Sequence, residues 1–187
     1  MLAQDLLMGL AALHGRPHYR FHRALHPGNV LLRPGAIGVH FGIADWQLAL
    51  PMAANAESVW LPPELKERPS LFRWLAADHD DRTCDAAFDL WCLGVLLTQA
   101  MTGLVDPDGA FHSAKAAPKA DAKAEKLLAT SKRAFLIAQV VDCAFEHPKL
   151  AAVVQQLLED DPAARGTSDW HLSLVKRAAR TRILKLK

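Results

Sequence analysis

The feature that most constrains the fold is an apolar run from Phe88 to Leu97 that contains one carboxylate, Asp89. Its apolar residues fall on nearly every side of a helix, which is typical of a helix buried in the centre of a domain. A charged side chain inside such a helix is costly unless hydrogen bonds satisfy it. The sequence therefore predicts a central buried helix in which Asp89 is hydrogen-bonded.

Further helices are predicted before and after this one. Residues 2–14 place leucines at helical spacing, and Gly15 ends the pattern. Two more helical stretches are expected at about 127–145 and 148–158, and a last helix from Trp170. These elements predict a mainly α-helical chain.

Composition limits the class of protein. The chain has 187 residues, 51% of them hydrophobic and 22% charged, which predicts a single globular domain spanning 1–187. A net charge of +2 is too small to indicate nucleic acid as a partner. No apolar run approaches the length of a transmembrane segment. Three cysteines without a C-x-x-C pair favour reduced thiols and a cytoplasmic location.

A small β-hairpin is predicted between the first helix and the central one. Short strands are expected at 30–32, 37–39 and 41–44, with a turn at 33–35. The hairpin would bring Asn29 and Asp45 to one place, and their oxygens suit a hard cation such as Mg²⁺. An equally good interpretation is that Asn29 bonds the loop backbone and Asp45 caps a turn.

Four histidines recur every four residues, a spacing that on one helix would align them as metal ligands: His14, His18, His22 and His26. Gly15 and proline residues interrupt any helix there. Ordinary loop and core histidines are therefore the favoured interpretation.

The end of the chain is basic. From 176 to 187 it carries six Lys or Arg residues and no acid. Such a tail suits an acidic partner or a membrane surface, but the favoured interpretation is a core-packing helix with a solvated end. Residues 66–85 are polar and are predicted to form a solvated loop, with a cation site at residues 78–81 as the less favoured interpretation. The charged insert 113–126 is predicted to be a loop followed by the start of a solvent-facing helix.

The segment from His22 to Asn29 reads His-Arg-Ala-Leu-His-Pro-Gly-Asn. It resembles the protein-kinase catalytic loop H-R-D-L-x-x-x-N, with His22 and Arg23 on the first two positions and Ala24 in place of the catalytic Asp. In the family that Asp accepts the proton of the substrate hydroxyl, and the Asn binds Mg²⁺. The resemblance implies that no catalytic base is present and that Asn29 is a vestigial metal ligand.

Four further features follow in the family's order. Asp45 resembles the metal-binding Asp of D-F-G, although a competing register places His40-Phe41-Gly42 on that motif. Residues 62–64 resemble the end of the activation segment. Asp89 resembles the central-helix Asp that accepts backbone N–H groups of the catalytic loop. Arg165 resembles the Arg that pairs with Glu64, and the pair is expected to be at least half-buried.

The resemblance also bears on Arg23. In many kinases this Arg pairs with a phosphorylated residue of the activation segment. The span from Asp45 to Glu64 is short for the family and leaves little room for a loop controlled by phosphorylation. Arg23 is therefore expected to lack such a ligand.

The resemblance implies a mainly α (α+β) fold: a kinase-like large lobe, or C-lobe, with one or two small β-hairpins. The variants around His26 and Asp45 are also similar to those of aminoglycoside phosphotransferases. The small N-lobe, which carries the Gly-rich loop and the phosphate-binding Lys, is expected to be absent. No cofactor is therefore expected, with weak Mg/ATP binding only if a partner supplies an N-lobe.

The function that the resemblance implies is a catalytically inactive pseudokinase lobe that binds or scaffolds another protein. The alternative is a phosphotransferase whose N-lobe comes from a partner chain or a longer parent protein. A decaying duplicate without function is a third interpretation. The partner is expected to cover the cleft at Asn29 and Asp45, both open to solvent, and apolar surface left bare on residues 2–14. The partner could also be a second copy of the chain.

Overall fold

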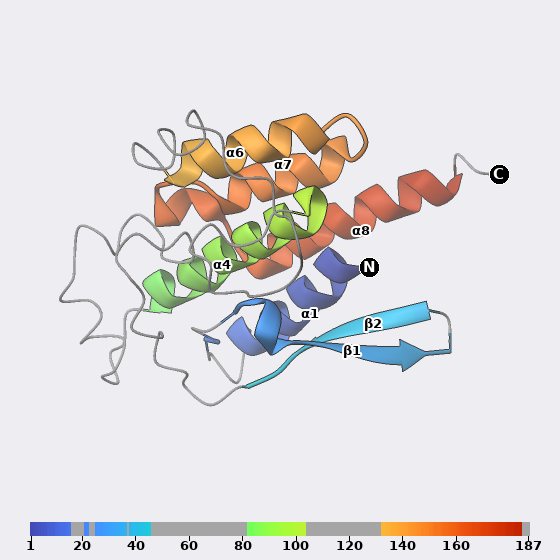
Figure 1. Cartoon of the computed structure of the whole chain (residues 1–187). Coiled ribbons are helices and arrows are strands. Elements are labelled where there is room, and N and C mark those ends of the chain that lie inside the picture. Colours follow the sequence, from blue (N-terminus) through green and yellow to red (C-terminus); the bar gives the residue numbers. More distant parts are fainter. Residues whose placement is uncertain (16–20, 23–24, 37, 46–81, 104–131, 185–187) are drawn as a thin grey trace.

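The structure is a computed structural model of the chain, and it describes residues 1–15, 21–22, 25–36, 38–45, 82–103 and 132–184. The described elements are mostly helices, with one two-stranded antiparallel sheet (Figure 1). This confirms the predicted mainly helical fold with a small hairpin. In chain order the elements are α1 (Leu2–His14), the 3-10 helix η1 (Pro27–Asn29), β1 (Val30–Gly35), β2 (Gly38–Ile43), α4 (Arg82–Thr102), α6 (Lys132–Cys143), α7 (Pro148–Leu157), the 3-10 helix η2 (Pro162–Arg165) and α8 (Ser168–Leu184).

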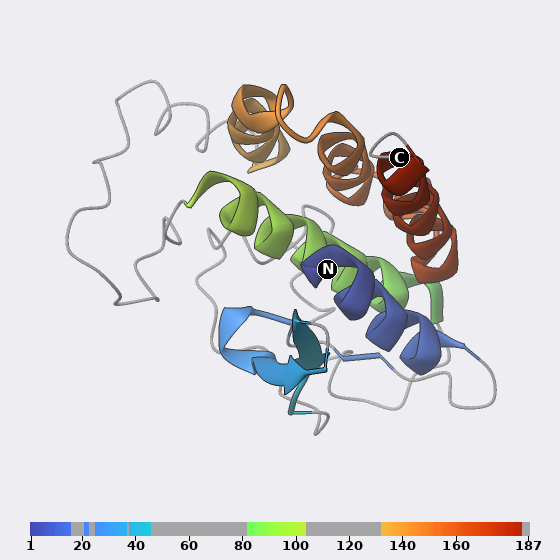
Figure 2. The same ribbon diagram turned by 90° about the vertical axis from the view of Figure 1, so that its right-hand side faces the viewer.

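Helix α4 lies at the centre, as its apolar run predicts. Leu90, Trp91 and Leu93 have no exposed surface. Helices α6 and α7 pack on α4, and Figure 2 shows α4 between these helices and the hairpin. Because α4 begins at Arg82, the prediction of a loop over 66–85 is wrong for its last four residues. The central helix therefore starts within that polar stretch.

Close packing of α4 on α7 depends on Gly94. A Cβ atom at this position would come within 2.8 Å of Leu158 Cδ2 and 3.1 Å of Leu157 Cβ. Atoms that close must move apart, so a side chain here would separate the two helices. The glycine therefore places the end of α7 directly against the central helix.

Helix α1 buries its apolar face against α8 and β2. Leu6, Leu7 and Leu10 are fully buried, so the prediction of bare apolar surface on residues 2–14 is wrong for them. The reason is that α8 lies alongside α1 (Figure 1), a pairing that sequence spacing does not reveal. Met8 keeps 48% of its surface exposed.

The hairpin is longer than predicted. Its strands pair from Val30 opposite Ile43 to Gly35 opposite Gly38. The predicted turn at 33–35 is wrong, because these residues continue β1. A two-stranded sheet has only edge strands, where the missing N–H of Pro34 is tolerated.

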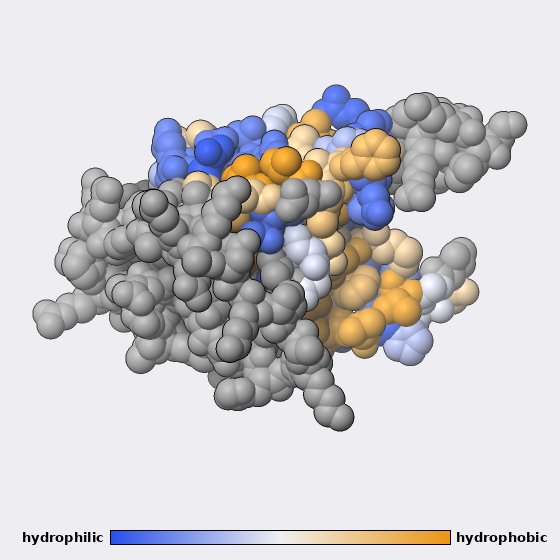
Figure 3. Space-filling view, turned by 45° about the horizontal axis from the view of Figure 1, so that its top comes forward, coloured by the Kyte–Doolittle hydropathy of each residue, from blue (hydrophilic) through white to orange (hydrophobic). Residues whose placement is uncertain are grey.

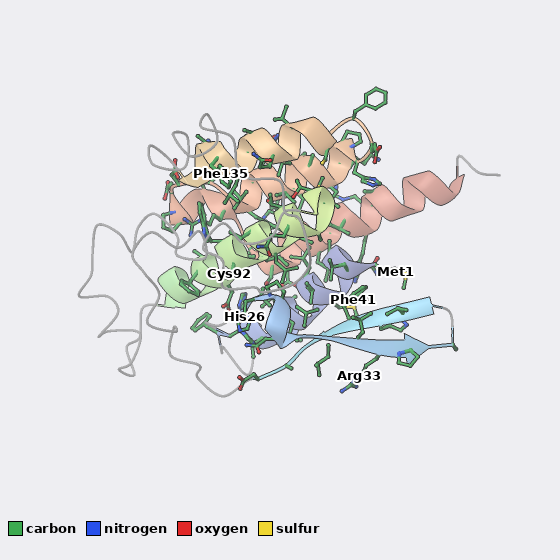
Figure 4. All side chains as sticks on the ribbon, in the orientation of Figure 1. Met1, His26, Arg33, Phe41, Cys92 and Phe135 are labelled. Carbon is green, nitrogen blue, oxygen red and sulfur yellow. The ribbon has the colours of Figure 1, made fainter. Side chains whose placement is uncertain are left out.

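One face of the hairpin is apolar along its whole length. Antiparallel pairing places Leu32 opposite Phe41 and Pro34 opposite Val39, so these four side chains share a face. Phe41 lies on the side of the hairpin toward Met1 and α1 (Figure 4) and is partly buried against the core. Leu32, opposite Phe41, is 67% exposed, and Val39, nearer the tip, is 40% exposed. Figure 3 shows hydrophobic side chains gathered in this region.

The C-terminal helices follow the predicted pattern. Helix α7 matches the predicted stretch 148–158. The structure describes the predicted stretch 127–145 from residue 132 onward, and α6 occupies Lys132–Cys143 of it. Helix α8 begins two residues before Trp170 and buries Leu172, in agreement with the favoured interpretation of a core-packing helix. No helix in the described part of the chain is long and apolar enough to cross a bilayer.

Candidate functional site

The buried carboxylate of Asp89 holds the segment that begins at His22. The backbone N–H of His22 donates to Asp89 Oδ2 at 2.7 Å, and both residues are almost fully buried. The prediction that Asp89 is hydrogen-bonded inside the central helix is confirmed. The donor that the resemblance assigned to this Asp, a backbone N–H of the segment that begins at His22, is also the one observed.

Asp89 has a second partner on α1. His14 Nε2 lies 2.9 Å from Asp89 Oδ2, and His14 Nδ1 lies 3.3 Å from Ser168 Oγ at the start of α8. Because an ionised carboxylate only accepts hydrogen bonds, Nε2 donates to Asp89. In the neutral imidazole, Nδ1 then accepts a hydrogen bond from the Ser168 hydroxyl. The three side chains tie α1, α4 and α8 together.

The order carboxylate, imidazole, hydroxyl is also that of a nucleophilic triad. A nucleophile must reach a substrate, but Ser168 is only 3% exposed. The groove that the structure describes, between α7 and α8, includes none of the three residues. The arrangement is therefore a buried structural network in the part of the chain described. No pattern in the sequence indicates this network, because the histidine spacing marks His14 as a metal ligand or a core histidine without naming a partner, and nothing singles out Ser168.

The imidazole of His22 connects its own segment to the end of the hairpin. His22 Nε2 lies 2.8 Å from the Ala44 carbonyl oxygen, and the Ala44 N–H donates to the Asn29 carbonyl at 2.8 Å. These bonds place Asn29 beside the residue that precedes Asp45. The hairpin thus brings the two candidate metal ligands to one place, as predicted.

The two candidate ligands differ in exposure. Asn29 is only 9% exposed, so the prediction that it is open to solvent is wrong. The short helix η1 and the bond to Ala44 turn this residue into the protein. Asp45 is exposed and has a φ of 60°, in the left-handed region that Asp tolerates better than most residues. It lies two residues after the end of β2, whereas residues 40–42 of the competing register lie inside that strand.

His26 completes the turn between these segments. Its Nδ1 accepts the N–H of Gly28 at 3.1 Å and caps η1. Burial lowers the pKa of His26, nearby His22 lowers it further, and Asp45 acts in the opposite direction. His26 is thus held in the neutral form, in which Nδ1 can accept a hydrogen bond.

The two residues after His22 in the kinase-like motif, Arg23 and Ala24, lie outside the described residues. The identity of Ala24 excludes a carboxylate base at that position whatever its conformation. The expectation that Arg23 lacks a phosphorylated ligand stays a prediction, since the activation-segment residues 50–60 are also outside the described ranges.

Arg165 is a buried cation. Its guanidinium donates to three backbone carbonyls, those of Ala87, Glu159 and Asp160, at 2.8 to 3.3 Å. It also lies 5.0 Å from the centre of the Trp91 ring. The predicted burial of Arg165 is confirmed. Its predicted partner Glu64 lies outside the described residues, so the ion pair stays a prediction.

Metal binding by the histidine repeat gains no support. His14 and His22 contact Asp89 and Ala44 as described above, and His18 lies outside the described residues. Within the described ranges no three metal-binding side chains come together.

Two loop predictions lie outside the described residues. They concern the polar stretch over 66–81 and the insert 113–126.

A second buried histidine lies at the start of α8. His171 is fully buried, and its Nε2 lies 2.6 Å from the Arg165 carbonyl. No described group hydrogen-bonds its Nδ1. Burial lowers the pKa of His171, and the bond to Arg165 only partly opposes this. The sequence analysis did not single it out, since one histidine in a polar helix start carries no pattern.

The lowered pKa of His171 predicts that the folded chain loses stability in acid. The unfolded chain takes up a proton on His171 near pH 6.5, while the folded chain does so only at lower pH. The free energy of unfolding should therefore fall as the pH drops below about 6.5, until the lower folded pKa is passed. We expect His171→Gln, which keeps a donor but does not titrate, to show a shallower fall in urea melts between pH 7.5 and 5.

The exposed His147 supplies the control. His147→Gln removes a surface histidine and should change the free energy of unfolding at pH 7.5 by less than about 0.5 kcal/mol. His26 acts in the same direction as His171, so part of the acid sensitivity should remain in His171→Gln. Parallel profiles for the wild-type chain and His171→Gln would contradict the prediction.

No protein-family model matches the chain, and no curated protein matches it.

Proposed function

We propose that this chain is a catalytically inactive, protein-kinase-like lobe that binds another protein. One observation carries the proposal: the buried Asp89 carboxylate accepts the backbone N–H of His22, two residues before Ala24. The contact expected of a kinase catalytic loop is present, while the residue at the position of the base is an alanine. The buried Arg165 is consistent with the same fold.

Ala24 removes the chemical step that the loop would perform. A methyl group cannot accept the proton of a substrate hydroxyl. General-base assistance is usually worth about 10² to 10⁴ in rate. A phosphotransferase that lacks it would depend on positioning and charge alone.

The metal site is also weakened. Of the two candidate ligands, only Asp45 has an exposed side chain, because Asn29 is largely buried. Mg²⁺ loses its water reluctantly and usually needs substrate phosphates in addition to one or two carboxylates. One accessible carboxylate should therefore hold Mg²⁺ with ATP only weakly.

The surface proposed for the partner is the apolar face of the hairpin. Leu32 and Val39 are exposed there, and Met8 is exposed on the adjacent α1. Contiguous exposed apolar patches are typical of protein interaction sites, and the partner would cover these side chains together. The buried leucines of α1 are not part of this surface, so the proposed contact is smaller than the sequence suggests.

The proposal places the protein in the cytosol. Neither Cys92 nor Cys143 forms a disulfide in the described part of the chain. Reduced cysteines are usual in a reducing compartment. The partner is another protein or a second copy of this chain.

Titration calorimetry with Mg-ATP tests the proposed loss of metal and nucleotide binding. We expect no saturable binding in the micromolar range, because the burial of Asn29 leaves Asp45 alone to hold the ion. A matched titration of Asp45→Asn should give the same trace. A micromolar dissociation constant that Asp45→Asn abolishes would contradict the proposal and favour the phosphotransferase.

A further inference from the structure

A groove of about 430 Å³ lies between α7 and α8, away from Asp89 and the hairpin. Its apolar lining includes Ala152, Val153 and Leu174. Trp170 forms part of the wall and keeps 43% of its surface exposed. The lining also contains two cations, Lys149 and Arg177, and Gln156 and Ala178 complete it.

The two helices present regular faces to the groove. On α7 the lining residues recur from Lys149 to Gln156 at spacings of three and four, and on α8 they do so from Trp170 to Ala178. Such spacing places each set on one side of its helix. Seven residues of helix rise about 10 Å, so the groove matches about two turns of a helical ligand.

The cations lie at the same end of the groove. Helices α7 and α8 run in opposite directions (Figure 1), joined by the segment that contains η2. Gln156 donates to the Ala164 carbonyl of η2, which places it at the Trp170 end. Lys149 and Arg177 are then together at the other end.

Two more features make that end electropositive. The N-terminus of α7 lies there, and no side chain caps it, so its first-turn N–H groups keep their partial positive charge. Acidic residues are scarce on both helices: α7 has none, and α8 has only Asp169 at its opposite end. The exposed Glu146 precedes α7 at the basic end, where the two cations and the helix N-terminus outweigh this one carboxylate. The groove thus combines an apolar lining with one basic end.

We propose that this groove binds an acidic helical segment of a partner protein, with apolar side chains against Trp170 and carboxylates facing Lys149 and Arg177. Apolar side chains at positions i, i+3, i+4 and i+7 are how a helix occupies such a groove. Charge complementarity selects an acidic ligand. A flat anionic membrane fits less well, because the apolar side chains line a concave surface. The inference does not depend on the kinase resemblance.

Selection from a displayed library of 16-residue helical peptides, with the purified full chain as bait, tests the proposal. We expect the enriched peptides to carry Asp or Glu near one end and apolar residues at i, i+3, i+4 and i+7. Fluorescence anisotropy of one labelled peptide then measures affinity. Arg177→Glu and Lys149→Glu should each raise its dissociation constant by about tenfold or more.

Lys176→Glu is the matched control, because Lys176 is exposed on α8 next to Arg177 but does not line the groove. It should raise the dissociation constant by less than about threefold. Circular dichroism verifies that each variant stays folded. Enriched peptides without an acidic excess, no enrichment at all, or equal losses for Lys176→Glu and Arg177→Glu would each overturn the proposal. Binding to phosphatidylserine vesicles, or self-association seen by light scattering, without selection of acidic peptides would do the same.

Discussion

Replacing Asp89 by alanine is expected to lower the free energy of unfolding by about 3 to 5 kcal/mol, or to prevent folding. The variant leaves the N–H of His22 and the imidazole of His14 buried without the carboxylate that both contact. Buried polar groups that lose their partner cost their full desolvation. Urea denaturation followed by circular dichroism measures the change.

Two further variants separate this effect from simple loss of charge. Asp89→Asn keeps a side-chain oxygen in place and should destabilise less than Asp89→Ala. Asp45→Asn removes an exposed carboxylate and tolerates the left-handed backbone at that position, so it should change stability by less than about 0.5 kcal/mol. Equal losses for Asp89→Ala and Asp45→Asn would show that the buried network does not stabilise the fold.

Replacing Arg165 by alanine should be similarly severe, at about 3 to 5 kcal/mol. The guanidinium satisfies the carbonyls of Ala87, Glu159 and Asp160 and packs on Trp91, and alanine replaces none of these contacts. Arg165→Lys should recover only part of the loss, since an ammonium does not reproduce the planar set of donors. Thermal and urea melts give the comparison.

Arg33, exposed on β1, is the control for Arg165. Arg33→Ala should change the free energy of unfolding by less than about 0.5 kcal/mol. A double-mutant cycle with Glu64→Ala also tests the predicted ion pair. Additive losses would show that Glu64 does not pair with Arg165, and a stable Arg165→Ala would show that the buried cation is dispensable.

The elements that could be predicted are those set by local pattern. The apolar run around Asp89 identified the central helix, and the leucine spacing of residues 2–14 gave the bounds of α1. The hairpin was found but cut short, because Pro34 is a usual turn residue. A local signal of this kind does not report whether a strand lies at an edge.

The candidate site was predictable only in part. Asn29 and Asp45 were expected together because a hairpin joins them, and they are close. The burial of Asn29 depends on the turn of η1 and was not foreseen. The bond between His14 and Ser168 spans 154 residues, and no periodicity in either segment indicates it.

The packing of α1 on α8 has a consequence for synthesis on the ribosome. At about 5 to 20 residues per second, the roughly 150 residues between these helices take about 8 to 30 s to emerge. During that interval Leu6, Leu7 and Leu10 have no α8 to cover them. The nascent chain therefore presents an apolar helix to chaperones, and its core closes only after α8 has left the exit tunnel.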